Sequence, residues 1–391
     1  MEYVLLIFFF SCVFIPLFSY IVFPWYMNVA TKHLNKTKNN YESISEWPHV
    51  TIVFSVFNEE TVIRRKLESL FNSNYPAEKL HVLIGSDHST DQTNLIIEEF
   101  ILRNKNIILI KKETRNGKLK IINELIDLVK TEHVIFTDAN VFFEPITLNA
   151  LVYNLLKNNA QMVGGNIMKF SPKNGGISGQ EIFYMNFENQ LKYNESLKYG
   201  FCVGVEGGCY GILKQSFIKV PDGFLMDDFF ITLNVISNNG KVLFEPQAVC
   251  YEDVNDDPMI EFKRKIRISL GNFRNLKYYK HLLFPIHKGF GFAFFFHKVL
   301  RWFTPFALVL SFLISFLLSF YYNLFNAITL GYSLVLILPY LTIYLEKLKL
   351  KIPIINTLGH FILMNFALLI GYFKYISATN ESAWEPPKRN I

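Results

Sequence analysis

Residues 132–140, EHVIFTDAN, decide the fold that this sequence predicts. Val134, Ile135 and Phe136 form a short apolar run between polar residues, which is typical of a strand buried on both faces, as in a parallel sheet. In open parallel sheets, ligands bind in the crevice outside the carboxyl ends of the strands. We therefore expect Asp138 and Asn140, which follow this run, to lie in a ligand-binding crevice.

Asp138 and Asn140 form a candidate metal site. Two oxygen-bearing side chains that flank one alanine lie on the same side of an extended chain. Such a pair can hold a hard cation and, through it, a diphosphate. The alternative is that Asp138 only caps the turn before Pro145, where the next helix is expected to begin. The neighbouring motifs have to decide between these interpretations.

A unit of strand, polar turn and helix repeats along the chain. The candidate strands are residues 50–58, 81–87, 106–112 and 132–140, each followed by a helical pattern. This alternation predicts right-handed βαβ crossovers and a doubly wound α/β sheet. One edge of that sheet would then carry Asn58, Asp87, Lys118 and Asp138. Neither GxxxxGK[ST] nor GxGxxG follows the first strand, which counts against NTPases and NAD enzymes.

Two of these edge residues have a chemical use on their own. Asp87 can accept hydrogen bonds from a base or a ribose, as acidic residues do in dinucleotide sites. The Lys118 ammonium can meet a phosphate, because Gly117 before it permits a close approach of the backbone. The alternative for Lys118 is a solvated helix start.

The composition predicts membrane segments at both ends. Hydrophobic residues make up 51% of the chain, and residues 3–27 carry no charge and are long enough to cross a bilayer. Because these residues lack a basic start and a cleavage site, we expect a retained anchor. The further expected spans are residues 303–322, 326–345 and 353–373. The predicted order is an N-terminal helix (1–28), a catalytic domain (45–255), interfacial helices (256–302), membrane helices (303–376) and a tail (377–391).

Charge patterning predicts the orientation in the membrane. Lys32, Lys36 and Lys38 follow the first span, and Lys298 and Arg301 precede the second. The positive-inside rule places the central region in the cytoplasm of a multi-pass plasma (inner) membrane protein. Four crossings would return the C-terminus to the outside, so either the last span re-enters or another segment crosses.

The net charge and the cysteine pattern indicate which partners this chain binds and in which compartment it lies. The net charge of +6 indicates attraction to anionic membrane lipids and not to nucleic acid, because the basic residues cluster beside the apolar spans. The four cysteines form no CxxC pair, which indicates a reducing compartment and argues against a zinc site.

An ordered set of motifs resembles a known enzyme family. VFSVFNEE (53–60), GSDHSTDQT (85–93), RNGK (115–118) and FTDAN (136–140) look like the nucleotide-sugar half of the family 2 inverting glycosyltransferases. This resemblance implies a GT-A fold, which has a Rossmann-like, doubly wound mixed sheet. Three later segments are similar to the acceptor-side glycine-rich segment, the Thr-Glu-Asp helix and the Gln-x-x-Arg-Trp region, namely 206–214, 223–246 and 264–272. The membrane layout and the tail at 380–389 resemble bacterial surface-polysaccharide enzymes, the cellulose, hyaluronan and poly-N-acetylglucosamine synthase group.

The resemblance implies a site for a nucleotide-diphosphate sugar, with UDP as the expected nucleotide. Asp228 would be the base that takes the proton from the attacking hydroxyl. Its neighbour Asp227 would raise one of the two pKa values through like-charge repulsion. The alternative is that both are first-turn carboxylates favoured by the helix dipole. Mg²⁺ or Mn²⁺ would lie on Asp138 and Asn140. The donor-binding residues implied are Asn58, Glu59, Asp87, Lys118, Asp138, Arg264 and Arg267.

Three departures from the family pattern keep alternatives open. Ile268 replaces the tryptophan and Arg264 the glutamine, which bears on processive chain extension. Asn140 replaces a second acid, so metal binding would be weaker. Residues 260–280 also fit a basic amphipathic helix on the bilayer. The expected acceptor is a polysaccharide or a polyprenyl-linked saccharide; the alternatives are a single-addition enzyme with a lipid-linked acceptor, and a catalytically silent scaffold or transport partner.

Overall fold

The computed structural model describes residues 1–34, 39–170, 177–253, 258–347 and 352–377. Lys36, Lys38 and the tail at 380–389 lie outside these residues. The chain divides into two units, each described here by itself. The sheet unit contains His33–Phe170 and Met185–Val254, and the helical unit contains Met1–Lys32, Ser171–Tyr184 and Asn255–Thr379.

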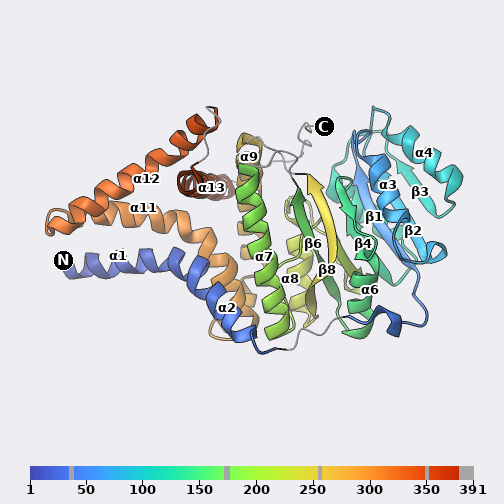
Figure 1. The fold of residues 1–391 in the computed structure, drawn as a ribbon, viewed down its shortest axis with the longest axis horizontal. Coiled ribbons are helices and arrows are strands. Elements are labelled where there is room, and N and C mark those ends of the chain that lie inside the picture. Colours follow the sequence, from blue (N-terminus) through green and yellow to red (C-terminus); the bar gives the residue numbers. More distant parts are fainter. Residues whose placement is uncertain (35–38, 171–176, 254–257, 348–351, 378–391) are drawn as a thin grey trace. The chain divides into compact units, whose positions relative to one another are not determined.

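The sheet unit is built on one sheet whose eight described strands have the order β3-β2-β1-β4-β7-β6-β8-β5. Figure 1 labels β1, β2, β3, β4, β6 and β8 of this sheet. The strands are β1 (Val50–Val56), β2 (Leu80–Ser86), β3 (Ile107–Lys111), β4 (His133–Thr137), β5 (Val141–Phe143), β6 (Met162–Phe170), β7 (Cys209–Leu213) and β8 (Val242–Asp253). The first four correspond to the four strands expected from the sequence.

The sheet is mixed. β1, β2, β3 and β4 are parallel to one another, as the βαβ alternation predicts. β7 then inserts antiparallel between β4 and β6, while β8 pairs parallel with β6 and antiparallel with β5. All five residues of β4 are buried, so the prediction that residues 132–140 hold a central strand is confirmed.

Helices cover both faces of the sheet. On one face, Gly85 of β2 lies against Ile121 and Leu125 of α5. On the other face, Gly211 of β7 lies against Leu151 and Leu155 of α6. The helices of this unit include α3 (Ile63–Phe71), α4 (Thr93–Arg103), α5 (Lys118–Leu128), α6 (Thr147–Lys157) and α8 (Asp227–Ser237), while α7 (Ile177–Tyr199) enters it at Met185; short 3₁₀ turns span Tyr41–Ser43, Ala77–Lys79 and Lys214–Ser216.

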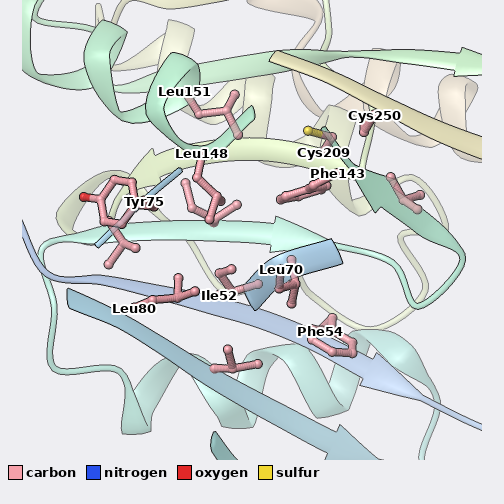
Figure 2. Close-up of a cluster of buried hydrophobic side chains, with 14 of the residues drawn as sticks. Ile52, Phe54, Leu70, Tyr75, Leu80, Phe143, Leu148, Leu151, Cys209 and Cys250 are labelled. Carbon is pink, nitrogen blue, oxygen red and sulfur yellow. The ribbon is translucent and has the colours of Figure 1, made fainter. Parts of the chain in front are cut away.

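The main hydrophobic core fixes α3, α4 and α6 to the sheet. Figure 2 shows Ile52 and Phe54 of β1, Leu70 of α3 and Leu148 of α6 in one cluster, and all four are fully buried. Burying each such side chain is worth about 1.5–3 kcal/mol relative to leaving it in water. The core therefore holds the strands, and with them the residues that follow each strand, in fixed places.

Within the part of the helical unit that the structure describes, four helices are long and apolar enough to cross a membrane: Glu2–Thr31, Gly289–Ser319, Asn323–Leu345 and Ile354–Ile376. Its elements are α1 (Glu2–Leu17), a π-helical turn (Phe18–Val22), α2 (Phe23–Thr31), α9 (Pro258–Tyr278), a 3₁₀ turn (Lys280–Leu283), α10 (Gly289–Ala293), a π-helical turn (Phe294–Val299), α11 (Leu300–Leu318), α12 (Asn323–Lys347) and α13 (Pro353–Ile376).

The second apolar helix begins earlier than residue 303, where the sequence predicts it. A π-helical turn joins α10 to α11, so the helix runs without a break from Gly289. His297 is consequently buried inside the unit, with its ring 6.2 Å from the ring of Phe23, and does not lie on the outside of an interfacial segment.

Candidate active site

Three parallel strands end, and one antiparallel strand begins, at the same edge of the sheet. β1, β2 and β4 share one direction, so the residues after them, Asn58, Asp87 and Asp138, lie at one edge, called here the carboxyl edge. Thr137, the last residue of β4, pairs with Cys209, the first of β7. The loop at 206–208 therefore lies at the carboxyl edge as well.

Asp87 organises the turn in front of α5. Its Oδ1 accepts a hydrogen bond from the Asn116 backbone N–H at 2.6 Å, and its Oδ2 accepts one from the Gly117 N–H at 2.9 Å. Gly117 has a φ of +88°, which glycine adopts without a Cβ penalty. Asp87 is buried, so this role in placing the start of α5 accompanies any contact with a nucleotide.

Lys118, the first residue of α5, is ion-paired with Asp138. Its Nζ lies 2.5 Å from Asp138 Oδ1. Burial lowers the pKa of Lys118, but the carboxylates of Asp138, Asp227 and Asp228 outweigh burial and raise it above its usual value. The Lys118 ammonium is therefore held at the carboxyl edge by Asp138, and its contact with a phosphate stays a prediction.

The expectation that Asp138 and Asn140 point the same way is wrong. Residues 138–140 form a tight turn, closed by the Val141 N–H that donates to the Asp138 carbonyl at 3.2 Å, and not a continued strand. Asp138 bonds to Lys118, whereas the Asn140 amide donates to Glu252 Oε1 at 3.2 Å. The alternation of side chains along an extended chain does not apply inside such a turn.

Asp228, in the first turn of α8, is a buried carboxylate. Its Oδ2 accepts from the Gly207 N–H at 2.8 Å and its Oδ1 from the Phe229 N–H at 2.7 Å. Burial, followed by the nearby charges of Asp227 and Glu206, raises the pKa of Asp228 to about 7. The expectation that one member of the Asp227–Asp228 pair has a raised pKa is confirmed, although burial contributes more than repulsion.

Glu206 belongs to the same cluster; it begins the segment 206–214 that the resemblance identified, but no role was predicted for it. Its carboxylate is ion-paired with Lys192 of α7, whose side chain is buried. The negative charge of Glu206 helps to raise the pKa of Asp228. A Glu-Gly-Gly segment directly before a strand is a signal that could have pointed to Glu206, because such loops lie at sheet edges.

Asn58 and Glu59 connect the end of β1 to the loop after β2. The Asn58 side-chain oxygen accepts from the Thr90 N–H at 2.9 Å, and its backbone N–H donates to Ser89 Oγ at 3.2 Å. The Glu59 N–H donates to Thr93 Oγ1 at 2.7 Å. These contacts fix both residues at the carboxyl edge, where they remain predicted donor contacts.

Arg264 and Arg267 lie on α9 of the helical unit. Arg264 makes a two-pronged ion pair with Glu261, with Nε to Oε2 at 2.6 Å and Nη2 to Oε1 at 3.0 Å. Lys265 lies 3.4 Å from the same carboxylate. Their contact with a diphosphate stays a prediction, which the geometry inside the helical unit leaves untested.

The carboxyl edge suits a divalent cation whose coordination is completed by the substrate. Among the residues that the structure describes, no three Asp, Glu, His or Cys side chains gather to hold a metal by themselves. Mg²⁺ commonly binds one or two carboxylates together with substrate phosphates. The Asp138 side chain is 36% exposed beside Lys118, so a cation that also binds a diphosphate can reach it.

Comparisons with known proteins agree on the sheet unit. Residues 51–220 match the model described as Glycosyl transferase family 2. The probable glycosyltransferase YdaM of Bacillus subtilis (strain 168) is 24% identical over 241 residues, or 59% of this chain and 57% of that protein. The dolichyl N-acetyl-alpha-D-glucosaminyl phosphate 3-beta-D-2,3-diacetamido-2,3-dideoxy-beta-D-glucuronosyltransferase of Methanococcus voltae is 28% identical over 219 residues, or 51% of this chain and 65% of that protein. The chain thus spans less than two thirds of either relative.

A solved structure shares the fold. The mannosyltransferase PcManGT from Pyrobaculum calidifontis, in complex with GDP-Man and Mn²⁺, matches with a TM-score of 0.72 at 18% identity, over 96% of this chain and 98% of that chain. At this identity the likeness establishes the fold alone. The chain therefore has a mixed α/β GT-A fold, and residues 51–220 within it match the family 2 glycosyltransferase model.

Proposed function

We propose that this protein transfers a sugar, with inversion, from a nucleoside diphosphate sugar to a saccharide acceptor at a membrane. The observation that carries the proposal is Asp228, a buried carboxylate with a pKa raised to about 7, in the same charge cluster as Lys118 and Asp138. A base works best when its pKa lies near the operating pH. The Lys118 ammonium supplies positive charge near a departing diphosphate, and Asp138 is a ligand that a divalent cation can use.

In this mechanism the acceptor hydroxyl attacks the anomeric carbon of the donor sugar. The new C–O glycosidic bond forms while the bond from that carbon to the diphosphate oxygen breaks. The hydroxyl proton goes to Asp228, and the nucleoside diphosphate leaves with its electron pair. The Lys118 ammonium faces the charge that develops on the leaving group. Arg264 and Arg267 are proposed to add further contacts to the diphosphate.

A divalent cation, Mg²⁺ or Mn²⁺, is proposed to be held by Asp138, with Asn140 as a second oxygen donor. When bound, such a cation neutralises diphosphate charge. Asn140 reaches this position only if its contact with Glu252 is exchanged, since the two side chains are now bonded. PcManGT was solved with GDP-Man and Mn²⁺, which supports a cation and widens the donor beyond UDP-sugars to GDP-sugars.

The acceptor is proposed to be a lipid-linked saccharide or a growing polysaccharide at the cytoplasmic face of the plasma (inner) membrane. Four helices apolar enough to cross a membrane support a membrane-bound acceptor. The name of the Methanococcus voltae relative describes a dolichyl-phosphate-linked acceptor. Ile268, in place of an aromatic residue, favours the addition of a single sugar over a processive polymerase.

One experiment tests these statements together. The protein, reconstituted in lipid, is incubated with labelled UDP- and GDP-sugars, Mg²⁺ or Mn²⁺, and lipid-linked acceptors, and the products are sized. One added sugar supports single addition, and a ladder supports processive synthesis. Nucleotide binding without transfer or donor hydrolysis under any condition, equal in wild type and Asp228→Asn, would instead identify a catalytically silent scaffold.

A further inference from the structure

Lys66 is a lysine in the core of the sheet unit. It lies on α3 between Arg65 and Leu67, and its side chain has no exposed surface. Burying an amine away from water is costly unless it is paired and hydrogen-bonded. Burial lowers the pKa of Lys66 to about 7, which shows that its surroundings compensate for the charge only in part.

The contacts of Lys66 converge on the turn at 138–140. Its Nζ donates to Thr137 Oγ1 at 2.8 Å, directly before the turn, and to the Val141 carbonyl, directly after it. The Phe143 ring lies under the ammonium, with 4.1 Å from Nζ to the ring centroid. Lys66 thus joins the two ends of the turn that carries Asp138 and Asn140.

The same hydrogen-bonded chain continues to the loop at 206–208, called here the Asp228 loop because it bonds to the Asp228 carboxylate. Thr137 Oγ1 donates to the Gly208 carbonyl at 2.8 Å. Gly207, the residue before it, donates its N–H to Asp228 Oδ2 at 2.8 Å. One buried amine is therefore connected, through one hydroxyl, to both the Asp138 turn and the Asp228 loop.

We propose that Lys66 is a positioning residue that holds the Asp138 turn and the Asp228 loop at a fixed separation. This inference rests on the proposed glycosyl transfer, in which Asp138 acts on the donor side and Asp228 on the acceptor side. Transfer requires the leaving diphosphate and the attacking hydroxyl to be aligned at one anomeric carbon. A displacement of about 1 Å in such an arrangement costs on the order of 100-fold in rate. Lys66 does not itself touch the reacting atoms.

If Lys66 acted in folding alone, a variant without the amine would lose turnover only as far as it lost stability. The positioning role predicts a loss of turnover without a loss of stability. Burying an amine away from water is costly, and an apolar side chain of similar length avoids that cost. Lys66→Met should therefore melt at the same temperature as wild type or higher, in the absence of metal and donor, while kcat falls about 100-fold. Binding of the nucleoside diphosphate should weaken far less, because Lys118 is retained.

Arg64→Met is the matched control on the same helix. Arg64 is half exposed and pairs with Glu99 at 2.7 Å, so its loss should leave kcat and the melting temperature near wild type. All variants are assayed in lipid with the panel of UDP- and GDP-sugars and Mn²⁺. Full turnover by a folded Lys66→Met protein would overturn the inference, and so would a loss of turnover that follows a loss of stability.

Thr137→Val keeps the test decisive if Lys66→Met does not fold. It removes the hydroxyl that joins Lys66 to Gly208 and leaves the amine in place. We expect kcat to fall about tenfold, equivalent to about 1.4 kcal/mol, and the double variant to lose little more than Lys66→Met alone. Full turnover by Thr137→Val, or independent losses in the double variant, contradicts the inference. A wild-type protein that transfers no sugar defeats the proposed function instead, so the two failures are distinguishable.

Discussion

The substitution Asp228→Asn should abolish transfer and also change how stability depends on pH. The pKa of Asp228 is raised from 3.8 to about 7 in the folded protein. At about 1.36 kcal/mol per pKa unit, a shift of roughly three units corresponds to about 4 kcal/mol. Because the folded pKa lies above the unfolded one, this contribution to stability is fully present below pH 4 and is lost as the pH rises to 7.

Asparagine does not titrate, so the variant lacks this loss. The difference in unfolding free energy, variant minus wild type, should rise by about 4 kcal/mol between pH 4 and pH 8. The introduced amide has one oxygen and can accept only one of the two N–H groups now bonded to Asp228, which subtracts a pH-independent amount of about 1–3 kcal/mol. The test is therefore how this difference in unfolding free energy changes with pH, and not its sign at any one pH.

The assay is thermal unfolding of both proteins at several pH values from 4 to 8. With roughly 2–4 °C per kcal/mol for a unit of this size, the difference in Tm should change by roughly 8–16 °C across the range. Asp222→Asn is the matched control, because the Asp222 side chain is 77% exposed and should give a flat difference. A difference for Asp228→Asn that is equally flat would refute the assignment of a raised pKa, and normal turnover would refute its role as the base.

Three further substitutions test the surroundings of Asp228. Asp227→Asn removes a charge that raises the pKa of Asp228, so the acid limb of the profile of kcat against pH should move to lower pH. An unmoved limb would show that Asp227 does not influence the pKa of Asp228. Lys118→Met should raise the donor KM at least tenfold and move that limb to higher pH, as measured by steady-state kinetics, since Lys118 lowers the pKa of Asp228. Asp87→Asn leaves one of the two partly buried N–H groups of Asn116 and Gly117 without its carboxylate partner, so it should destabilise the protein by about 1 kcal/mol and weaken nucleotide binding. Thermal unfolding and calorimetry measure the two effects, and unchanged values would show that the turn before Lys118 forms without Asp87.

The strands were predictable because a strand that is buried on both faces consists of a short apolar run. The runs before Asn58, Asp87 and Asp138 are each buried on both faces, so their composition, their spacing and the helices between them identified a parallel arrangement. The ends of those strands then placed the donor-side candidates at one edge without further information. The start of α8 at Asp227 followed in the same way from two acids before an apolar helix.

The antiparallel β7 could not be predicted from the sequence, because pairing direction depends on a partner that lies far away along the chain. Glu206 was missed for the same reason, since its role depends on Lys192 in α7. Lys66 resembles a surface lysine between Arg65 and Leu67, and only its three-dimensional partners show that it is buried. The turn after Asp138 gives Asp138 and Asn140 different partners, Lys118 and Glu252, and no local pattern near Asn140 indicates this turn.

The junction between β4 and β7 has a consequence for how the proposed specificity can diversify. Thr137 and Gly208 are 71 positions apart, so the segment proposed to bind the nucleotide and the segment proposed to face the acceptor are encoded separately and meet along the β4–β7 ladder. Under the proposed function, we expect exchanges on the β7 side of that ladder to change the acceptor and to leave the choice of nucleotide unchanged.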